Sequence, residues 1–202
     1  MKRKFYLLKI SLLGITPSIW REFVVPSDIS LDRLHDVIQI IMGWSDRHIH
    51  EFRIGKSRYS EFLDPDDENL ILFSSQFRLN ELVKRKGRTF NYIYDFGNLW
   101  NHEIVVESTN YKSDLDLEIF CVAGDRACPP EDVGGIDGYK HFLEVINNPA
   151  NVDYEKYLQW SDNSYDSEYY DEKIINWLLI KYYIWSRDRY LDWTEDFDED
   201  DN

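Results

Sequence analysis

The sequence has few cysteines, few basic residues and no long apolar run, and each shortage excludes a class of protein. Cys121 and Cys128 are the two cysteines among 202 residues, too few for a disulfide framework, and reduced thiols fit the cytoplasm. The longest apolar stretch, residues 174–185, contains Lys181 and is too short to span a bilayer. The first residues lack the basic, apolar and small-residue regions of a signal peptide. We therefore expect a cytoplasmic protein without a membrane span.

The charge balance is acidic, with 38 Asp and Glu against 23 Lys and Arg and a formal net charge of −15. This charge repels phosphate backbones, and the glycine-rich phosphate-binding patterns are absent, so we do not expect nucleic acid as a partner. A hydrophobic content of 43% and an aromatic content of 16% predict a bulky core. We expect a single domain over residues 1–190, followed by an acidic, disordered tail over residues 191–202.

Periodicity predicts an α+β fold. Strands are expected at residues 5–12, 19–25, 48–54, 58–60, 89–96, 99–107 and 117–122. The clearest helix spans Leu31 to Met42, with Ser30 as its N-cap and Gly43 as its left-handed C-terminal residue. Shorter helices are expected at 79–84, 139–146 and 154–160, and a longer one at 171–189. We predict a mostly antiparallel, curved sheet packed against the Leu31–Met42 helix and the C-terminal helices.

The segment YDFGNLWNHEIVVE, residues 94–107, organises these predictions. It is an aromatic-rich hairpin in which Gly97 and Asn98 tolerate the positive φ of a tight turn. The segments RHIHEF (47–52) and RACPPEDVGG (126–135) are its expected partners. A cleft between the three would be lined by a set of aromatic and histidine side chains: Trp44, His48, His50, Tyr94, Trp100 and His102.

Alternation places His48 and His50 on one strand face, an arrangement that suits a divalent metal ion if further ligands converge. The candidate metal ligands are His48, His50, His102, Glu131 and Asp132, and His35, Asp95 and Cys128 are also available. The spacing matches no diagnostic metal motif. The alternative is that the two histidines join strands by hydrogen bonds and pack beside aromatic rings.

Three residues are candidates for catalysis. Asp95 and His102 flank the hairpin and could form an acid–base pair, although aspartate at a turn more often accepts backbone N–H bonds. Cys128 would need a positive environment to become a nucleophile; Arg126 supplies one positive charge, and Glu131 and Asp132 oppose it.

Five segments together resemble a known family: IWREFVVP (19–26), LHDVIQIIMGW (34–44), HIHEF (48–52), YDFGNLWNHEI (94–104) and GDRACPPEDVGGIDGY (124–139). Their order and spacing over residues 5–179 resemble the plasmid pRiA ORF-three-like family, also known as an insertion-element passenger TnpR family, whose fold is grouped as MM-type after an archaeal structural-genomics target. The resemblance implies a compact α+β domain of bacteria, archaea and mobile elements, without an established biochemical activity.

Two positions depart from that family. Its EDCGG loop has a cysteine where this chain has Val133, and its DFGD hairpin has an aspartate where this chain has Asn98. If those residues bind metal in relatives, this chain lacks two of the ligands.

Two functions remain open on these grounds. The first is a non-enzymatic binding or accessory domain whose cleft takes a small molecule, a peptide or a protein partner. The second is a hydrolase that uses a divalent metal or an Asp–His pair at the same cleft. The sequence does not specify the oligomeric state.

Overall fold

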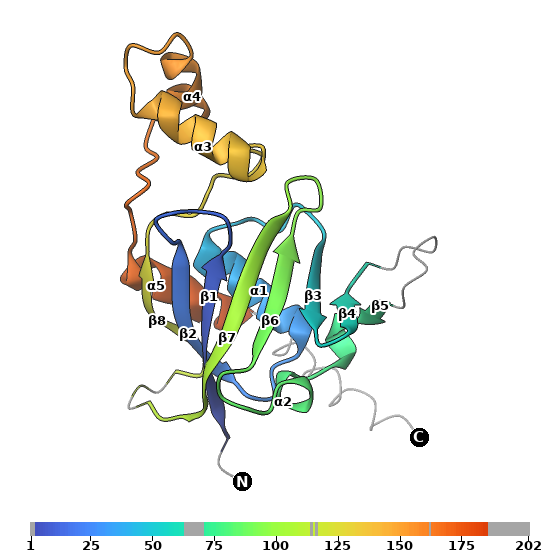
Figure 1. Ribbon diagram of the computed structural model, residues 1–202. Helices are drawn as coiled ribbons and strands as arrows, with labels where there is room; N and C mark the ends of the chain where they lie inside the picture. The colour runs from blue at the N-terminus through green and yellow to red at the C-terminus, as the bar shows by residue number, and fades with distance from the viewer. Residues whose placement is uncertain (1–2, 63–70, 114, 116, 162, 186–202) are drawn as a thin grey trace, which may run out of the picture.

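Eight strands form one open sheet in the computed structural model, which describes residues 3–62, 71–113, 115, 117–161 and 163–185 (Figure 1). The strand order is β5-β4-β3-β6-β7-β1-β2-β8, and all neighbours are antiparallel except β4 and β5. The strands are β1 (Phe5–Leu12), β2 (Trp20–Pro26), β3 (His50–Ile54), β4 (Ser57–Ser60), β5 (Ile71–Phe73), β6 (Thr89–Tyr94), β7 (Trp100–Tyr111) and β8 (Phe120–Asp125). The predicted α+β fold class is confirmed.

The centre of the sheet follows from the alternation in β1. Its even-numbered side chains, Tyr6 to Leu12, are buried and its odd-numbered ones are partly exposed. Leu8 pairs with Phe23 of β2 and Ile10 with Ile104 of β7, so apolar residues from three strands share one face.

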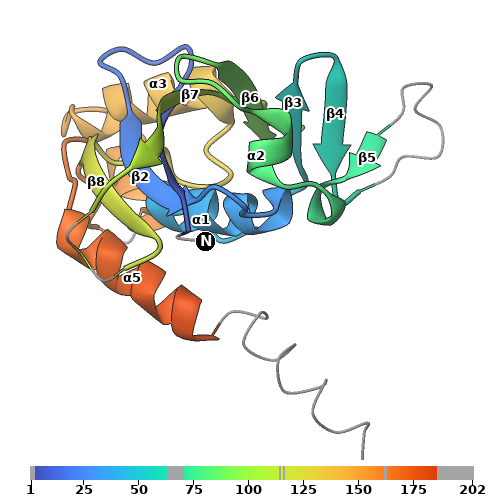
Figure 2. The ribbon, with the colours of Figure 1, turned by 90° about the horizontal axis from the view of Figure 1, so that it is seen from below.

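Helix α1 (Leu31–Met42) lies across the concave side of the curved sheet (Figure 2). Its buried stripe includes Leu34 and Ile38, both fully enclosed, and each such side chain stabilises the fold by roughly 1.5–3 kcal/mol. Ser30 holds the N-cap position without a side-chain hydrogen bond, which differs from the capping role expected for it. Gly43 ends the helix with φ 79°, as predicted.

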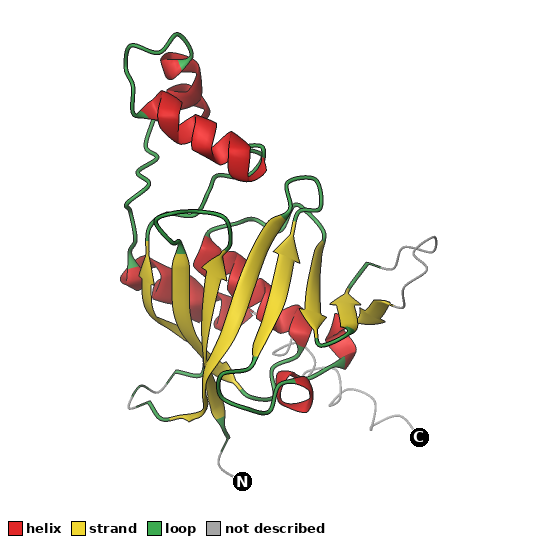
Figure 3. Ribbon diagram, in the orientation of Figure 1, coloured by secondary structure: helices red, strands yellow, loops and turns green. Residues whose placement is uncertain are grey.

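The remaining helices lie near the two ends of the strands and along β8 (Figure 3). They are a short 3₁₀ turn (Ser74–Gln76), α2 (Leu79–Leu82), α3 (Gly135–Ile146), α4 (Tyr154–Trp160) and α5 (Glu172–Trp185). Helices α3 and α4 pack on each other beyond the ends of the strands, whereas α5 lies against β8 and α1. The side-chain amide of Asn176 fixes α5 to β8, because it accepts from the Cys121 N–H at 2.7 Å and donates to the Cys121 carbonyl at 2.9 Å.

The turn between β6 and β7 differs from the prediction. The residues with positive φ are Asp95 (57°) and Leu99 (53°), and neither Gly97 nor Asn98 has one. The Asp95 carboxylate accepts N–H groups from inside its own turn, which favours a left-handed aspartate. The acidic segment at 64–69 and the acidic tail lie outside the described residues. Within the described part, we find no helix with the length and apolarity that a membrane crossing requires.

Candidate functional site

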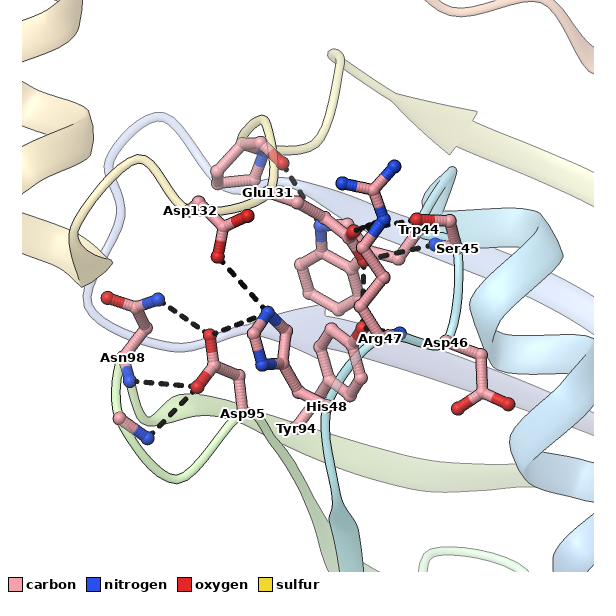
Figure 4. A network of polar contacts seen from close by, with 12 residues as sticks. Trp44, Ser45, Asp46, Arg47, His48, Tyr94, Asp95, Asn98, Glu131 and Asp132 are labelled. Carbon is pink, nitrogen blue, oxygen red and sulfur yellow. Dashed lines mark hydrogen bonds and ion pairs between the residues drawn. The ribbon is translucent and has the colours of Figure 1, made fainter.

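Three loops meet beside the end of α1, as the sequence suggested, and hydrogen bonds join them (Figure 4). The Trp44 indole donates to the Pro129 carbonyl at 3.0 Å. The Ser45 backbone and hydroxyl donate to the Glu131 carboxylate at 3.0 and 2.7 Å, and the Tyr94 hydroxyl donates to it at 2.8 Å. The segment after α1 is therefore fixed to the 126–135 loop and to the end of β6.

Glu131 is the centre of these contacts. Burial alone would raise the pKa of its carboxyl group, but the hydrogen bonds from Ser45 and Tyr94 and the nearby Arg47 charge lower it overall. The carboxylate already accepts three hydrogen bonds, so Glu131 holds loops together and has little capacity left for a metal ion.

Asp95, Asp132 and His48 form a second group next to Glu131 (Figure 4). The His48 Nε2 atom lies 3.2 Å from Asp132 Oδ1 and 3.6 Å from Asp95 Oδ2. Asp95 is buried, and its carboxylate accepts from the Gly97 N–H at 2.9 Å and from the Asn98 side chain at 2.6 Å. One imidazole nitrogen thus faces carboxylates from two different loops.

His48 and His50 do not share a strand face, so that expectation is wrong. The strand begins only at His50, and the segment before it turns at Asp46, which has φ 53°. His50 lies instead with His35 and Asp46 in a separate cluster.

The predicted aromatic cleft is a packed cluster in the structure. Trp44 stacks on Tyr94 with ring centroids 4.9 Å apart and meets the edge of His102 at 5.2 Å. Trp44, Tyr94, Trp100 and His102 are at most 7% exposed, so these four belong to the core. Of the six residues expected to line a cleft, His48 and His50 line the pocket described below.

His102 is enclosed completely. Its Nδ1 atom lies 3.2 Å from the Tyr92 carbonyl, which fixes the proton on Nδ1, and Nε2 has no partner among the described residues. Burial lowers the pKa of His102 to about 4, so the ring is neutral near pH 7. Asp95 is engaged with its own turn, and no hydrogen bond of the described residues joins it to His102.

Cys128 packs against Met42, with its Sγ atom 3.7 Å from the methionine sulfur and 3.5 Å from Arg21 Nη2. Burial raises the pKa of Cys128 to about 11, although the Arg21 charge opposes the shift. A thiol that stays protonated is a poor nucleophile.

A pocket of about 430 Å³ opens between α1, the segment entering β3 and the end of β4. Its lining is Asp32, Arg33, His35, Asp36, Asp46, Arg47, His48, Ile49, His50, Ser60, Glu61 and Phe62. Four carboxylates outnumber two guanidinium groups, so the lining carries negative charge when its histidines are neutral. Burial lowers the pKa of His50 to about 3, and the adjacent His35 adds to the shift.

A closed ring of hydrogen bonds supports this pocket. The Asp46 backbone N–H donates to Gln39 Oε1 at 3.0 Å, and the Gln39 amide donates to the Tyr92 hydroxyl at 2.9 Å. Tyr92 Oη lies 2.8 Å from His35 Nδ1, and His35 Nε2 lies 2.9 Å from Asp46 Oδ1. The Asp46 carboxylate can only accept, so His35 donates its Nε2 proton to it, and the other nitrogen of the neutral ring, Nδ1, accepts from the Tyr92 hydroxyl.

Two polar atoms of the pocket lining are buried and have no hydrogen-bond partner among the described residues. They are Asp32 Oδ1 and His50 Nε2. An unpaired buried polar group costs about 1–3 kcal/mol, so both residues carry unsatisfied polarity just beneath the surface of the pocket. Sequence reasoning named His50 and missed Asp32, whose position in the first turn of α1 suggested only a favourable charge at the helix dipole.

Comparisons with known proteins find a family model, a similar protein and a similar solved structure. The model described as plasmid pRiA4b ORF-3-like protein matches residues 4–173. The uncharacterized protein y4hQ of Sinorhizobium fredii is 38% identical over 164 residues, which cover 79% of this chain and 82% of that protein. The crystal structure of MM3350, a protein of unknown function from Methanosarcina mazei Go1, is similar with a TM-score of 0.75 and 33% identity, covering 86% of this chain and 98% of that one.

Proposed function

The chain belongs to the plasmid pRiA4b ORF-3-like family, a family without an assigned function, and we propose that it is a ligand-binding domain whose pocket beside α1 takes a small cationic molecule. The observation that carries the proposal is the acidic lining of the pocket, in which four carboxylates face two guanidinium groups. Two of the lining residues, Asp32 and His50, also hold a buried polar atom without a partner among the described residues. A primary or secondary amine supplies the N–H donors and the positive charge that such a lining lacks.

The pocket has the dimensions and the composition of a small-molecule site. Its volume of about 430 Å³ falls in the range of roughly 300–1,000 Å³ that is usual for ligand pockets. Ile49 and Phe62 supply exposed apolar surface at its edge, which suits the methylene chain of an alkyl amine. Arg33 is paired with Asp36 and Arg47 with Glu131, so the positive charge of each arginine is balanced and repels a bound cation less.

The remaining features support a small molecule over a nucleic acid, since the formal charge of −15 opposes a phosphate backbone. A lysine or arginine side chain of a peptide would present the same chemistry. The cytoplasm and an origin on mobile elements belong to the proposal: the two free cysteines support the first, and the plasmid in the family's description supports the second.

Isothermal titration calorimetry tests this function. The cationic probes are spermidine and arginine, and succinate is the anionic comparison. We expect one cationic probe to bind at a single site, and Asp32→Asn to weaken it about tenfold, because a hydrogen bond to a charged group is worth about 1.5–3 kcal/mol. The matched control is Asp137→Asn, a fully exposed carboxylate on α3. Tighter binding of succinate, no binding of either cation, or equal binding by Asp32→Asn would contradict the proposal.

A further inference from the structure

We propose that His48, Asp95 and Asp132 form a binding site for one divalent transition-metal ion. The three residues come from three loops, one after α1, one between β6 and β7, and one before α3, and their side chains converge (Figure 4). The site shares His48 with the pocket, but it lies on the side of that ring that faces the two aspartates, and it does not depend on a cationic ligand in the pocket.

The distances fit an ion in the middle of the group. The His48 Nε2 atom lies 3.2 Å from Asp132 Oδ1 and 3.6 Å from Asp95 Oδ2, and one donor atom from each residue lies within 4.8 Å of the others. Bonds of about 2.0–2.2 Å, as zinc forms with imidazole nitrogen and carboxylate oxygen, separate neighbouring donors by roughly 3.0 Å at right angles and 3.6 Å at 120°. Both nitrogen–oxygen distances therefore correspond to ordinary coordination angles.

The aspartate at the base of this group is preorganised. Asp95 is 4% exposed, and the N–H groups of Gly97 and Asn98 and the Asn98 side chain hold its carboxylate. The Asn98 side-chain amide donates to Asp95 Oδ2 at 2.6 Å. It thus orients the carboxylate that would bind the metal, as hydrogen-bond partners of metal ligands commonly do. Two carboxylates also balance the charge of a divalent cation.

The other side of the group is open to solvent. The His48 side chain is 30% exposed and that of Asp132 is 57% exposed, so water can complete the coordination. One imidazole and two carboxylates combine the ligands that zinc and manganese accept, and the Irving–Williams order places zinc ahead of manganese in affinity. We therefore assign the site to a divalent transition metal, with zinc bound more tightly than manganese.

A second group of possible ligands, His35, Asp46 and His50, is less suited to a metal although its donor atoms are equally close. The hydrogen-bond ring uses both nitrogens of His35, because Tyr92 donates to Nδ1 and Nε2–H donates to Asp46. A metal on Nε2 would displace its proton and break the hydrogen bond to Asp46, and a metal on Nδ1 would leave the buried Tyr92 hydroxyl without its acceptor. A metal at His48 also displaces the Nε2 proton, but the two carboxylates that this N–H faces both become ligands of the ion.

Calorimetric titration of tag-free protein with ZnCl₂, then with MnCl₂, tests the site. We expect one equivalent of zinc per chain, with affinity at least tenfold lower in Asp132→Asn and in His48→Gln. Both variants keep the size and polarity of the original side chain, and Asp132 is exposed, so folding is maintained and is checked by circular dichroism. Asn98→Ala, which removes the outer partner of Asp95, is expected to lower affinity about tenfold.

Asp46→Asn and Asp137→Asn locate the ion. The first alters the competing cluster and the second an unrelated surface carboxylate, and both are expected to bind zinc like the unchanged protein. The absence of zinc binding would show that His48 is a hydrogen-bonded cross-link between two loops. Zinc binding that persists in Asp132→Asn and His48→Gln, or that is lost in Asp46→Asn, would also overturn the assignment. None of these outcomes bears on amine binding, which is measured separately.

Discussion

The imidazole rings of His35 and His50 lie parallel, with centroids 3.5 Å apart and planes inclined by 7°. His35 is on α1 and His50 opens β3, so the stack joins the helix to the sheet at the base of the pocket. Two positive rings would repel each other at this distance, and burial lowers the pKa of His50 to about 3, which keeps that ring neutral. The hydrogen-bond ring fixes His35 in turn, so the base of the pocket is rigid before any ligand arrives.

Tyr92→Phe should break the ring and lower the free energy of unfolding by about 1–3 kcal/mol, because His35 Nδ1 loses its donor and the Gln39 amide loses its acceptor. Urea denaturation measures the loss. Nitrogen-15 NMR of the histidine rings gives a second reading: His35 should keep its proton on Nε2, facing Asp46, in both proteins, and its Nδ1 resonance should shift in the variant because that atom has lost its hydrogen bond. A loss below about 0.5 kcal/mol with an unchanged His35 spectrum would refute the role of the ring.

His102 should make the protein less stable in acid. The unfolded side chain takes up a proton near its ordinary pKa of 6.5, whereas burial lowers the folded value to about 4. Between these values the unfolded state binds more protons, so stability falls as the pH falls. From pH 7 to pH 5, protonation of this one group in the unfolded state lowers the free energy of unfolding by about 2 kcal/mol.

The measurement compares urea denaturation at pH 7 and pH 5 for the unchanged protein and for His102→Asn, which keeps a donor near the Nδ1 position. The difference between the two pH values should shrink by about 2 kcal/mol in the variant. His141→Gln, an exposed histidine on α3, is the control and should leave the difference as it was. Equal pH dependence in all three proteins would exclude His102 as the cause.

The parts of the fold that were predicted correctly depend on local periodicity. Residues 5–12 alternate, and β1 has those bounds; residues 31–42 carry an apolar stripe at helical spacing, and α1 has those bounds. The short strand β5 was missed, because its three residues are too few for a period and it pairs in parallel with β4.

The site was predicted in part, for a physical reason. The sequence indicated that the hairpin at 94–107 and the segments at 47–52 and 126–135 belong together, and they do meet. It did not separate His48 from His50, since their alternation does not indicate that the strand begins only at His50. Nor did it show that Trp44, Tyr94 and Trp100 fill the core, because burial depends on tertiary packing that strand alternation alone does not specify.

Glu51 should cost more stability to remove than Arg53, its partner in an ion pair. It is fully buried on β3, and Arg53 Nε and Arg58 Nη2 lie 2.5 and 2.6 Å from its two oxygens. Glu51→Ala removes the acceptor of both arginines, and water solvates them in part, because the Arg53 side chain is 55% exposed and that of Arg58 is 24% exposed. We expect a loss of about 1–3 kcal/mol in urea denaturation. Arg53→Ala, whose side chain is 55% exposed, should cost less than about 1 kcal/mol. Similar losses in the two variants would contradict a buried ion pair centred on Glu51.

Two adjacent carboxylates, Glu131 and Asp132, should respond differently to removal. Three donors converge on Glu131, the Ser45 N–H, the Ser45 hydroxyl and the Tyr94 hydroxyl, whereas Asp132 contacts His48 at 3.2 Å and is 57% exposed. Glu131→Ala should therefore lower the free energy of unfolding by about 1–3 kcal/mol. Asp132→Asn should change it by less than about 0.5 kcal/mol, because the site is exposed and asparagine tolerates the φ of 60° found there.

Urea denaturation without added metal measures both variants, and the same proteins are then titrated with zinc. Glu131 accepts structural hydrogen bonds, whereas Asp132 is a proposed metal ligand. Asp132→Asn should therefore bind zinc at least tenfold more weakly while keeping its stability. Glu131→Ala should show the opposite result. It should lose stability, but under conditions where it is still folded it should bind zinc with an affinity within about threefold of that of the unchanged protein. A loss of stability in Asp132→Asn as large as that in Glu131→Ala would mean that the 126–135 loop is held by both carboxylates, and the division between fold and site at this point of the chain would be wrong.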